Sequence, residues 1–250
     1  MRTKLVAGNW KMHGSRELTR TLVSGLAKEF AGAAPCEIAV CPPFAYLAEA
    51  AGQAEGTAIR VGAQDVSAHD EGAYTGEISG AMLAELGCRY AIVGHSERRS
   101  LHGETDELVA AKFLAAQRHG LVPILCVGES LAEREAGRTE AVVGRQLRAV
   151  LQAAGSEAFS RAVVAYEPIW AIGTGRTASP EQAQSVHAFI RGLLRSENGS
   201  IADFIKVLYG GSVKSANAAE LFAMPDVDGG LVGGASLEVG GFAGICRAAG

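Results

Sequence analysis

RYAIVGHSERRSLHGETDELVAAKFLAAQRHGLVPILCVG, residues 89–128, is the stretch that decides the fold of this chain. It opens with RYAIVG (89–94) and closes with LVPILCVG (121–128), two short runs rich in aliphatic and β-branched residues. Between them, DELVAAKFLAAQRHG (106–120) has the composition of a helix. Two apolar strands separated by a helix are typical of a parallel βαβ unit, in which the helix covers one face of the sheet.

The same alternation continues on both sides of this stretch. ELTRTLVSGLAKEFAG (17–32) and SPEQAQSVHAFIRGLLRSE (179–197) also have helical composition, and the second opens with Ser179 as N-cap and Pro180 at the first helical position. Eight strands that alternate with helices predict an α/β fold, a (β/α)8 barrel that forms a single domain over residues 1–250. The other six β-rich runs occupy residues 4–9, 37–42, 58–63, 162–167, 204–211 and 227–234.

The competing architecture is an open, doubly wound parallel sheet. A dinucleotide-binding sheet of that kind places GxGxxG directly after its first strand, whereas this chain has GNWKMHG there, at residues 8–14. No GxxxxGK[ST] phosphate loop occurs anywhere in the sequence. The motifs therefore favour the closed barrel.

Composition excludes several classes of function. A hydrophobic share of 48% with 20% charged residues is that of a folded α/β protein, and a net charge of -4 offers no general attraction to nucleic acid or to an anionic membrane. No leader-like segment or long uncharged apolar run is present, so we expect neither secretion nor a membrane span, and a cytoplasmic location. An odd number of cysteines without a CxxC pair predicts free thiols: Cys36, Cys41, Cys88, Cys126 and Cys246.

Active sites of such barrels lie at the carboxyl ends of the strands, which directs attention to a few side chains. Asn9 and Lys11 follow the first strand with the same parity and point to one face of the barrel mouth, although a lysine in that place is otherwise commonly a surface residue. His95 ends the fourth strand where a helix should start, and the positive end of that helix favours a neutral imidazole. Glu97 has two interpretations, a first-turn helix carboxylate or a partner of Lys11.

Glu167 ends the sixth strand, directly before Pro168, which holds it in extended backbone and stops the ladder. A carboxylate there projects from the strand end and is the best candidate for a general base, although a salt-bridged rim residue is the plainer alternative. The following AIGTG, residues 171–175, contains Gly173 and Gly175 and has the permissive ends of a closing loop.

Two glycine pairs end the seventh and eighth strands, in YGGSV (209–213) and GLVGGASL (230–237). Without side chains, their backbone N–H groups can approach a ligand closely, and Ser212 adds a hydroxyl donor. Barrels often bind phosphate after these two strands, so the pairs together predict a phosphate site, although tight turns use the same residues.

Taken together, the chain resembles the triosephosphate isomerase family, a family of TIM-barrel enzymes, along essentially its whole length. The resemblance rests on six segments: GNWKM, GAYTGE, VGHSERR, AYEPIWAIGTG, YGGSV and GLVGGASL. It implies isomerisation of dihydroxyacetone phosphate and glyceraldehyde 3-phosphate by proton transfer through an enediolate. No metal or redox cofactor is expected.

The resemblance also assigns roles. Asn9 and Lys11 would contact the substrate, His95 would be the electrophile and Glu167 the base, with residues 168–176 as the closing loop. The phosphate would be held largely through backbone amides, at Gly173, Ser212, Gly233 and Gly234.

An intersubunit loop is implied as well. Residues 64–79 resemble the segment whose tip, near Thr75, enters a partner subunit beside the active site, so a homodimer is expected. Arg176 stands where many relatives have lysine, and Asp65 where many have asparagine; neither touches the proposed chemistry.

Two rival functions remain open from the residues. A Schiff-base aldolase on the same barrel would use Lys206 or Lys11 as its amine nucleophile. A catalytically silent sugar-phosphate binding protein would lack the base or the electrophile, and this chain has a candidate for each.

Overall fold

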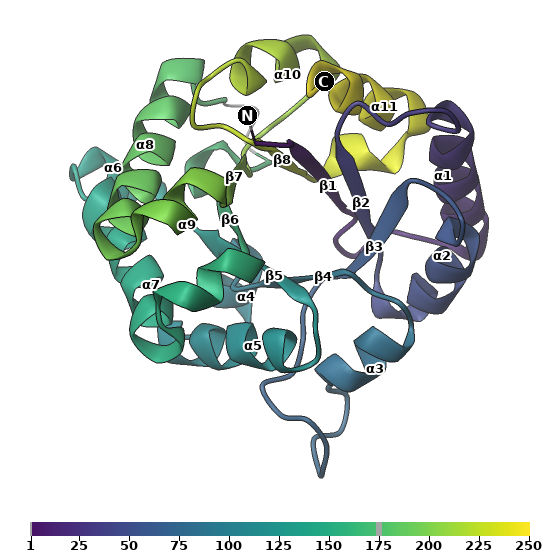
Figure 1. The fold of residues 1–250 in the computed structure, drawn as a ribbon, viewed down its shortest axis with the longest axis horizontal. Helices are drawn as coiled ribbons and strands as arrows, with labels where there is room; N and C mark the ends of the chain where they lie inside the picture. Colours follow the sequence, from purple (N-terminus) through teal and green to yellow (C-terminus); the bar gives the residue numbers. More distant parts are fainter. Residues whose placement is uncertain (1, 174–176) are drawn as a thin grey trace.

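A computed structural model of the chain describes residues 2–173 and 177–250. Eight parallel strands form a closed barrel in which each strand pairs with its sequence neighbours and β8 returns to β1 (Figure 1). Leu5 lies opposite Glu37 on one side and Gly229 on the other, which closes the ring. The strands are Leu5–Asn9 (β1), Glu37–Cys41 (β2), Ile59–Ala63 (β3), Tyr90–Val93 (β4), Val122–Val127 (β5), Val163–Tyr166 (β6), Lys206–Tyr209 (β7) and Gly229–Val232 (β8). The expected (β/α)8 barrel is confirmed.

Helices surround the strands as an outer ring (Figure 1). The α-helices of the described residues are Arg16–Glu29 (α1), Leu47–Ala54 (α2), Gly80–Glu85 (α3), Ser96–Leu101 (α4), Asp106–Arg118 (α5), Leu131–Glu135 (α6), Thr139–Ala154 (α7), Pro180–Glu197 (α8), Gly199–Phe204 (α9), Ser215–Phe222 (α10) and Val239–Ala248 (α11). Short 3-10 turns lie at Phe44–Tyr46 (η1), Ser156–Arg161 (η2), Ile169–Ala171 (η3) and Gly234–Leu237 (η4). Within residues 2–173 and 177–250, no helix has the length and hydropathy that a membrane crossing requires.

Local sequence signals explain the ends of these helices. Ser179 caps α8 as predicted. Its hydroxyl accepts a hydrogen bond from the Gln182 N–H, and the Gln182 side-chain oxygen accepts one from the Ser179 N–H. This reciprocal arrangement satisfies two backbone donors that have no partner within the helix. Two predicted strands were too long: Phe204 belongs to the last turn of α9, so β7 comprises only Lys206–Tyr209 of the predicted 204–211, and β8 comprises only Gly229–Val232 of the predicted 227–234.

Apolar side chains fill two separate spaces. One cluster lies between the strands and the helices, and the other lies inside the barrel, where inward-pointing residues come from every strand except β3. The interior is therefore packed rather than hollow, and a ligand has room only at the ends of the strands. The interior cluster contains Leu5, Ala7, Ala39, Cys41, Tyr90, Ile92, Ile124, Cys126, Val163, Ala165, Leu208 and Leu231.

The segment between β3 and α3 departs from this compact outline. It projects away from the ring of helices (Figure 1), and residues 69–77 at its tip are exposed. His69 and Tyr74 stack with ring centroids 3.8 Å apart, which gives the projecting tip some internal packing. This is the segment whose sequence predicts contact with a second subunit.

Candidate active site

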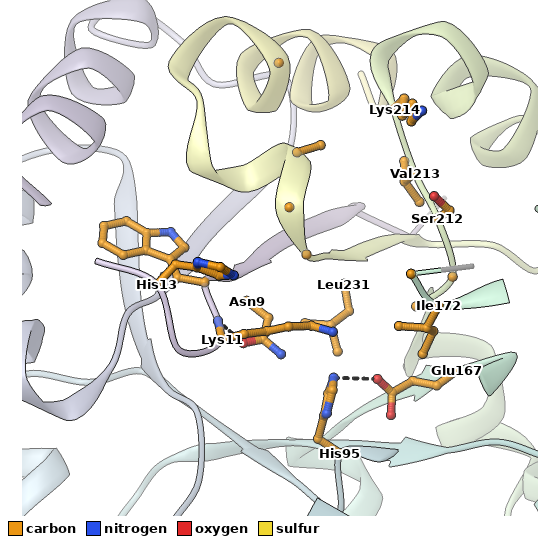
Figure 2. Close-up of a pocket in the computed structure, with 18 of the residues that line it drawn as sticks. Asn9, Lys11, His13, His95, Glu167, Ile172, Ser212, Val213, Lys214 and Leu231 are labelled. Carbon is orange, nitrogen blue, oxygen red and sulfur yellow. Dashed lines mark hydrogen bonds and ion pairs between the residues drawn. The ribbon is translucent and has the colours of Figure 1, made fainter. Parts of the chain in front are cut away.

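The candidate side chains meet at the carboxyl ends of the strands, around a cavity of about 580 Å³. Figure 2 shows Lys11 extending from one side of this cavity toward the paired side chains of His95 and Glu167, with Ser212 on the wall beyond them. The volume is that of a site for a small molecule. The lining includes all of the predicted substrate-contacting residues: Asn9, Lys11, His95, Glu167, Gly173, Ser212, Gly233 and Gly234.

His95 and Glu167 form the chemical centre of the site. His95 Nε2 lies 2.8 Å from Glu167 Oε1, and the other carboxylate oxygen accepts a 2.9 Å hydrogen bond from the Ser96 N–H. Glu167 is only 2% exposed and His95 5%. The structure thus brings a carboxylate and an imidazole into contact, although they are 72 residues apart in the chain.

The helix start predicted at His95 is confirmed, since His95 is the N-cap of α4. Its Nδ1 accepts the Glu97 N–H at 3.2 Å, so the single proton of a neutral ring sits on Nε2, facing Glu167. Burial disfavours the imidazolium, but the charge and hydrogen bond of Glu167 outweigh it and raise the pKa of His95. The sequence predicted a neutral ring from the helix start alone. It gave no sign of the contact with Glu167, which acts in the opposite direction by raising the pKa of His95.

The pKa of Glu167 moves in the complementary direction. Burial acts to raise it, yet the charge and hydrogen bond of His95, together with the Ser96 amide, lower the pKa below its ordinary value of 4.5. Glu167 is therefore ionised at neutral pH despite its burial, as a general base must be. The contact between the two side chains contributes to both shifts.

Lys11 lies in strained backbone. It is the one non-glycine residue among those described that has a positive φ, 53°. Its N–H donates to Asn9 Oδ1 at 3.0 Å, and its carbonyl accepts from Gln64 Nε2 at 2.8 Å. Its ammonium pairs with Glu97 at 2.5 Å, so Glu97 is both a first-turn helix carboxylate and the partner of Lys11. Strain of this kind persists only where surrounding contacts determine it, and it commonly marks a functional site.

The opposite wall offers backbone donors. The N–H groups of Ser212 and Gly233 donate to no other residue among those described. Gly233 directly precedes the short helix η4, and Asn217 fixes the Ser212 loop by donating to the Ser212 carbonyl at 3.2 Å. Free amides near a helix start suit an anion such as phosphate.

Two glycines pack against Glu167, where a larger residue would collide with it. A Cβ on Gly128 would lie 1.8 Å from the Glu167 carbonyl oxygen, and one on Gly210 would lie 2.9 Å from the Glu167 Cγ. Only glycine fits at Gly128, because the atom it would meet belongs to backbone. Gly210, the first glycine of the pair that the sequence assigned to a phosphate site, thus also makes room for the Glu167 side chain.

Glu129 forms hydrogen bonds with the first residues of the segment that follows Glu167. Glu129 accepts from the Trp170 indole at 3.0 Å and from the Tyr166 hydroxyl at 3.0 Å, and its carbonyl accepts the Ile169 N–H at 3.2 Å. The expected closing loop comprises residues 168–176; its last part, 174–176, lies outside the described residues. Gly173 is exposed with a φ of 69°, which L side chains rarely adopt.

Several supporting residues were not singled out from the sequence. Gln64, Ser96, Gly128 and Glu129 act on the site only through contacts between distant segments, and no local pattern distinguishes them. Lys206, one of the two amines considered for an aldolase, begins β7 and pairs with Glu37 at the opposite end of the barrel. It cannot serve as a nucleophile in this cavity.

These features define the class of the protein: it is an acid–base enzyme of (β/α)8 architecture. The closed barrel carries an acid–base pair at the carboxyl ends of its strands, with a lysine beside the pair and free backbone amides opposite. A family model described as triosephosphate isomerase matches residues 4–249. The triosephosphate isomerase of Nitrosococcus oceani is 60% identical over 250 residues, covering all of both chains. That of Thiobacillus denitrificans is 62% identical over 249 residues, covering 100% of this chain and 99% of its own, and that of Dechloromonas aromatica is 58% identical over 249 residues.

The chain belongs to the triosephosphate isomerase family. Its activity is the interconversion of dihydroxyacetone phosphate and D-glyceraldehyde 3-phosphate, a reaction of glycolysis and gluconeogenesis. The family inferred from the sequence motifs is confirmed.

Proposed function

We propose that Glu167 is the general base of this isomerisation and that His95 is the electrophile. The observation that carries the proposal is the 2.8 Å contact between His95 Nε2 and Glu167 Oε1 inside the cavity. A carbonyl oxygen that takes the place of the carboxylate receives the same Nε2–H hydrogen bond. Displaced from His95 in this way, the Glu167 carboxylate is free to face the adjacent carbon.

The proton transfers then balance. Glu167 takes a proton from the carbon next to the carbonyl, the electron pair moves to the carbonyl oxygen, and an enediolate forms while His95 donates to that oxygen. Proton exchange between the two oxygens through His95, and return of the carbon-bound proton from Glu167 to the neighbouring carbon, give the isomer. No net oxidation occurs, and the enzyme ends in its starting protonation state.

Lys11 and the amide wall hold the substrate in this scheme. The ammonium of Lys11, next to Asn9, offsets the charge of the enediolate and phosphate, and Glu97 positions it at 2.5 Å. The amides of Gly173, Ser212, Gly233 and Gly234 bind the phosphate. Such fixed donors stabilise charge without needing to reorganise as it develops.

The assembly and setting are part of the proposal. The exposed tip around Thr75 and the nearly fully exposed Met12, 95% accessible, are the surfaces expected to meet in a homodimer. Met12 directly follows Lys11, so a partner loop seated there would restrain the strained lysine. Residues 1–250 form one catalytic domain that acts in the cytoplasm.

Solvent isotope exchange tests the chemistry. In deuterium oxide, each triose phosphate should isomerise with solvent deuterium incorporated at the carbon next to the carbonyl, followed by proton NMR. The same reaction quenched with borohydride separates the aldolase alternative, because a Schiff base at Lys11 would leave a substrate adduct on that residue in the mass spectrum. A stable adduct at Lys11, or turnover without deuterium incorporation from either substrate, would overturn the proposed mechanism.

A further inference from the structure

The barrel has a second hollow at the end opposite the active site. Its volume is about 630 Å³, slightly larger than the active-site cavity, and it lies where strands begin rather than end. Arg89 precedes β4, Leu121 precedes β5 and Lys206 opens β7, and all three line it. The isomerase mechanism uses none of these residues.

The inner surface of this hollow is partly apolar. Leu121, Val163, Ile201 and Ile205 line it and are each at most 8% exposed, so their side chains form a fixed wall rather than a mobile rim. Phe204 stands at the edge and is 79% exposed. It also borders a neighbouring hollow of about 670 Å³ that shares Glu37 and Lys206. Its ring is therefore accessible to a molecule that enters the hollow.

The rim carries excess positive charge. Glu37 is the only carboxylate of the lining, and it is already engaged, since it pairs with Lys206 and accepts from the Tyr90 hydroxyl. Arg89 and Arg161 are both exposed, and neither guanidinium forms an ion pair or side-chain hydrogen bond with another described residue. Three cations against one carboxylate leave two positive charges on a chain whose net charge is -4.

Glu37 interacts with the positive charges of this rim. Burial acts to raise the pKa of Glu37, but hydrogen bonds from Lys206 and Tyr90 and the nearby charge of Arg89 lower it below the ordinary value of 4.5. Glu37 is therefore ionised and neutralises Lys206. The guanidinium of Arg89 is left to attract an external anion, and its planar fork matches a carboxylate.

We propose that this hollow is a second binding site, which takes a small aromatic carboxylate: the ring lies against the apolar wall and Phe204, and the carboxylate meets Arg89 and Arg161. The two requirements select against other small molecules. A bare inorganic anion would leave the apolar wall in water, and an uncharged aromatic would leave the guanidinium groups without a partner. The site is independent of the proposed catalytic roles, because the barrel interior between the two ends is filled by side chains.

Titration calorimetry with three matched probes tests the proposal. We expect 3-phenylpropionate to bind the wild-type protein with a Kd on the order of 1 mM, as suits a ligand of this size. Propionate, which lacks the ring, and 3-phenylpropan-1-ol, which lacks the charge, should each bind about tenfold more weakly or not detectably. Binding should persist when glycerol 3-phosphate saturates the active site. Loss of 3-phenylpropionate binding under that condition would place the ligand in the catalytic cavity and overturn the proposal.

Two variants localise the binding. Arg89→Gln should weaken 3-phenylpropionate binding about tenfold while isomerase turnover stays at the wild-type value. Arg138→Gln, at an exposed arginine that does not line the hollow, is the matched control and should bind normally. Equal affinity of Arg89→Gln and wild type would overturn the proposal, as would equal affinity of the wild type for the carboxylate and the alcohol. Should Arg89→Gln fail to fold, the three probes and the glycerol 3-phosphate competition still decide with wild-type protein.

Discussion

Replacing Glu167 by glutamine removes the proposed base while keeping its size. In the structure its two carboxylate oxygens each accept a hydrogen bond, from His95 Nε2 and from the Ser96 N–H. A glutamine side chain has only one oxygen, so its NH₂ group must face one of these donors. The His95 ring cannot adapt by moving its proton to Nδ1, because Nδ1 accepts from the Glu97 N–H. Glu167→Gln thus leaves one buried donor without a partner.

The loss of activity should be larger than the loss of stability. General-base catalysis contributes about 10²–10⁴-fold, which corresponds to roughly 3–5 kcal/mol of barrier. The unsatisfied donor costs about 1–3 kcal/mol of unfolding free energy, or several degrees in Tm for a chain of this length. An exposed residue at the barrel mouth would affect folding little, but Glu167 is only 2% exposed, so its replacement also lowers the free energy of unfolding.

The assay combines turnover in both directions with exchange of substrate hydrogen for solvent deuterium. Turnover and exchange should fall together in Glu167→Gln, whereas binding of glycerol 3-phosphate should survive, because the amides near Ser212 remain. Glu167→Asp should also be slow, since it withdraws the carboxylate by one methylene. Glu140→Gln, at an exposed glutamate of α7, is the matched control for loss of one negative charge. Near-normal deuterium exchange in folded Glu167→Gln would show that another group is the base and refute the reasoning.

Three further changes test other parts of the molecule. Thr75→Arg at the exposed loop tip should weaken dimerisation and lower turnover, and a variant that sediments as a monomer with full activity would show that the loop does not support the site. Gly173→Pro should weaken phosphate retention and increase methylglyoxal release, because the φ of 69° is incompatible with the proline ring; unchanged product ratios would contradict this. His187 is fully buried, and burial lowers its pKa from 6.5 to about 4. Between these pH values the unfolded chain binds a proton at His187 that the folded chain does not. The contribution of neutral His187 to the free energy of unfolding is therefore complete above pH 6.5 and is lost as the pH falls toward 4. His187→Gln should remove about 2–3 kcal/mol of the loss in unfolding free energy between pH 7.5 and pH 4.5, measured by urea titration, and identical pH slopes in variant and wild type would refute the assignment.

How far the sequence predicts the site depends on the range of each interaction. The cap at Ser179 and the helix start at His95 involve residues two or three positions apart, so local pattern was sufficient. The positive φ of Lys11 was not predicted from the sequence, because one of its supporting contacts comes from Gln64, which lies 53 residues away in the chain. Likewise, the need for glycine at Gly128 comes from the backbone of Glu167 on the adjoining strand.

The sequence by itself determined the alternation of eight strands and helices, and with it the end of the barrel where Asn9, His95 and Glu167 must lie. Periodicity and strand direction are properties of short segments, and parallel strands bring their carboxyl ends to one edge whatever the details of packing. Only the tertiary structure decided which atoms meet there. Contact between His95 and Glu167, and the shift of both pKa values that follows, require the barrel to close at a particular register, which is set by packing of the whole interior. The separation of Lys206 from the site has the same cause, since a strand places its first and last residues at opposite ends of the barrel.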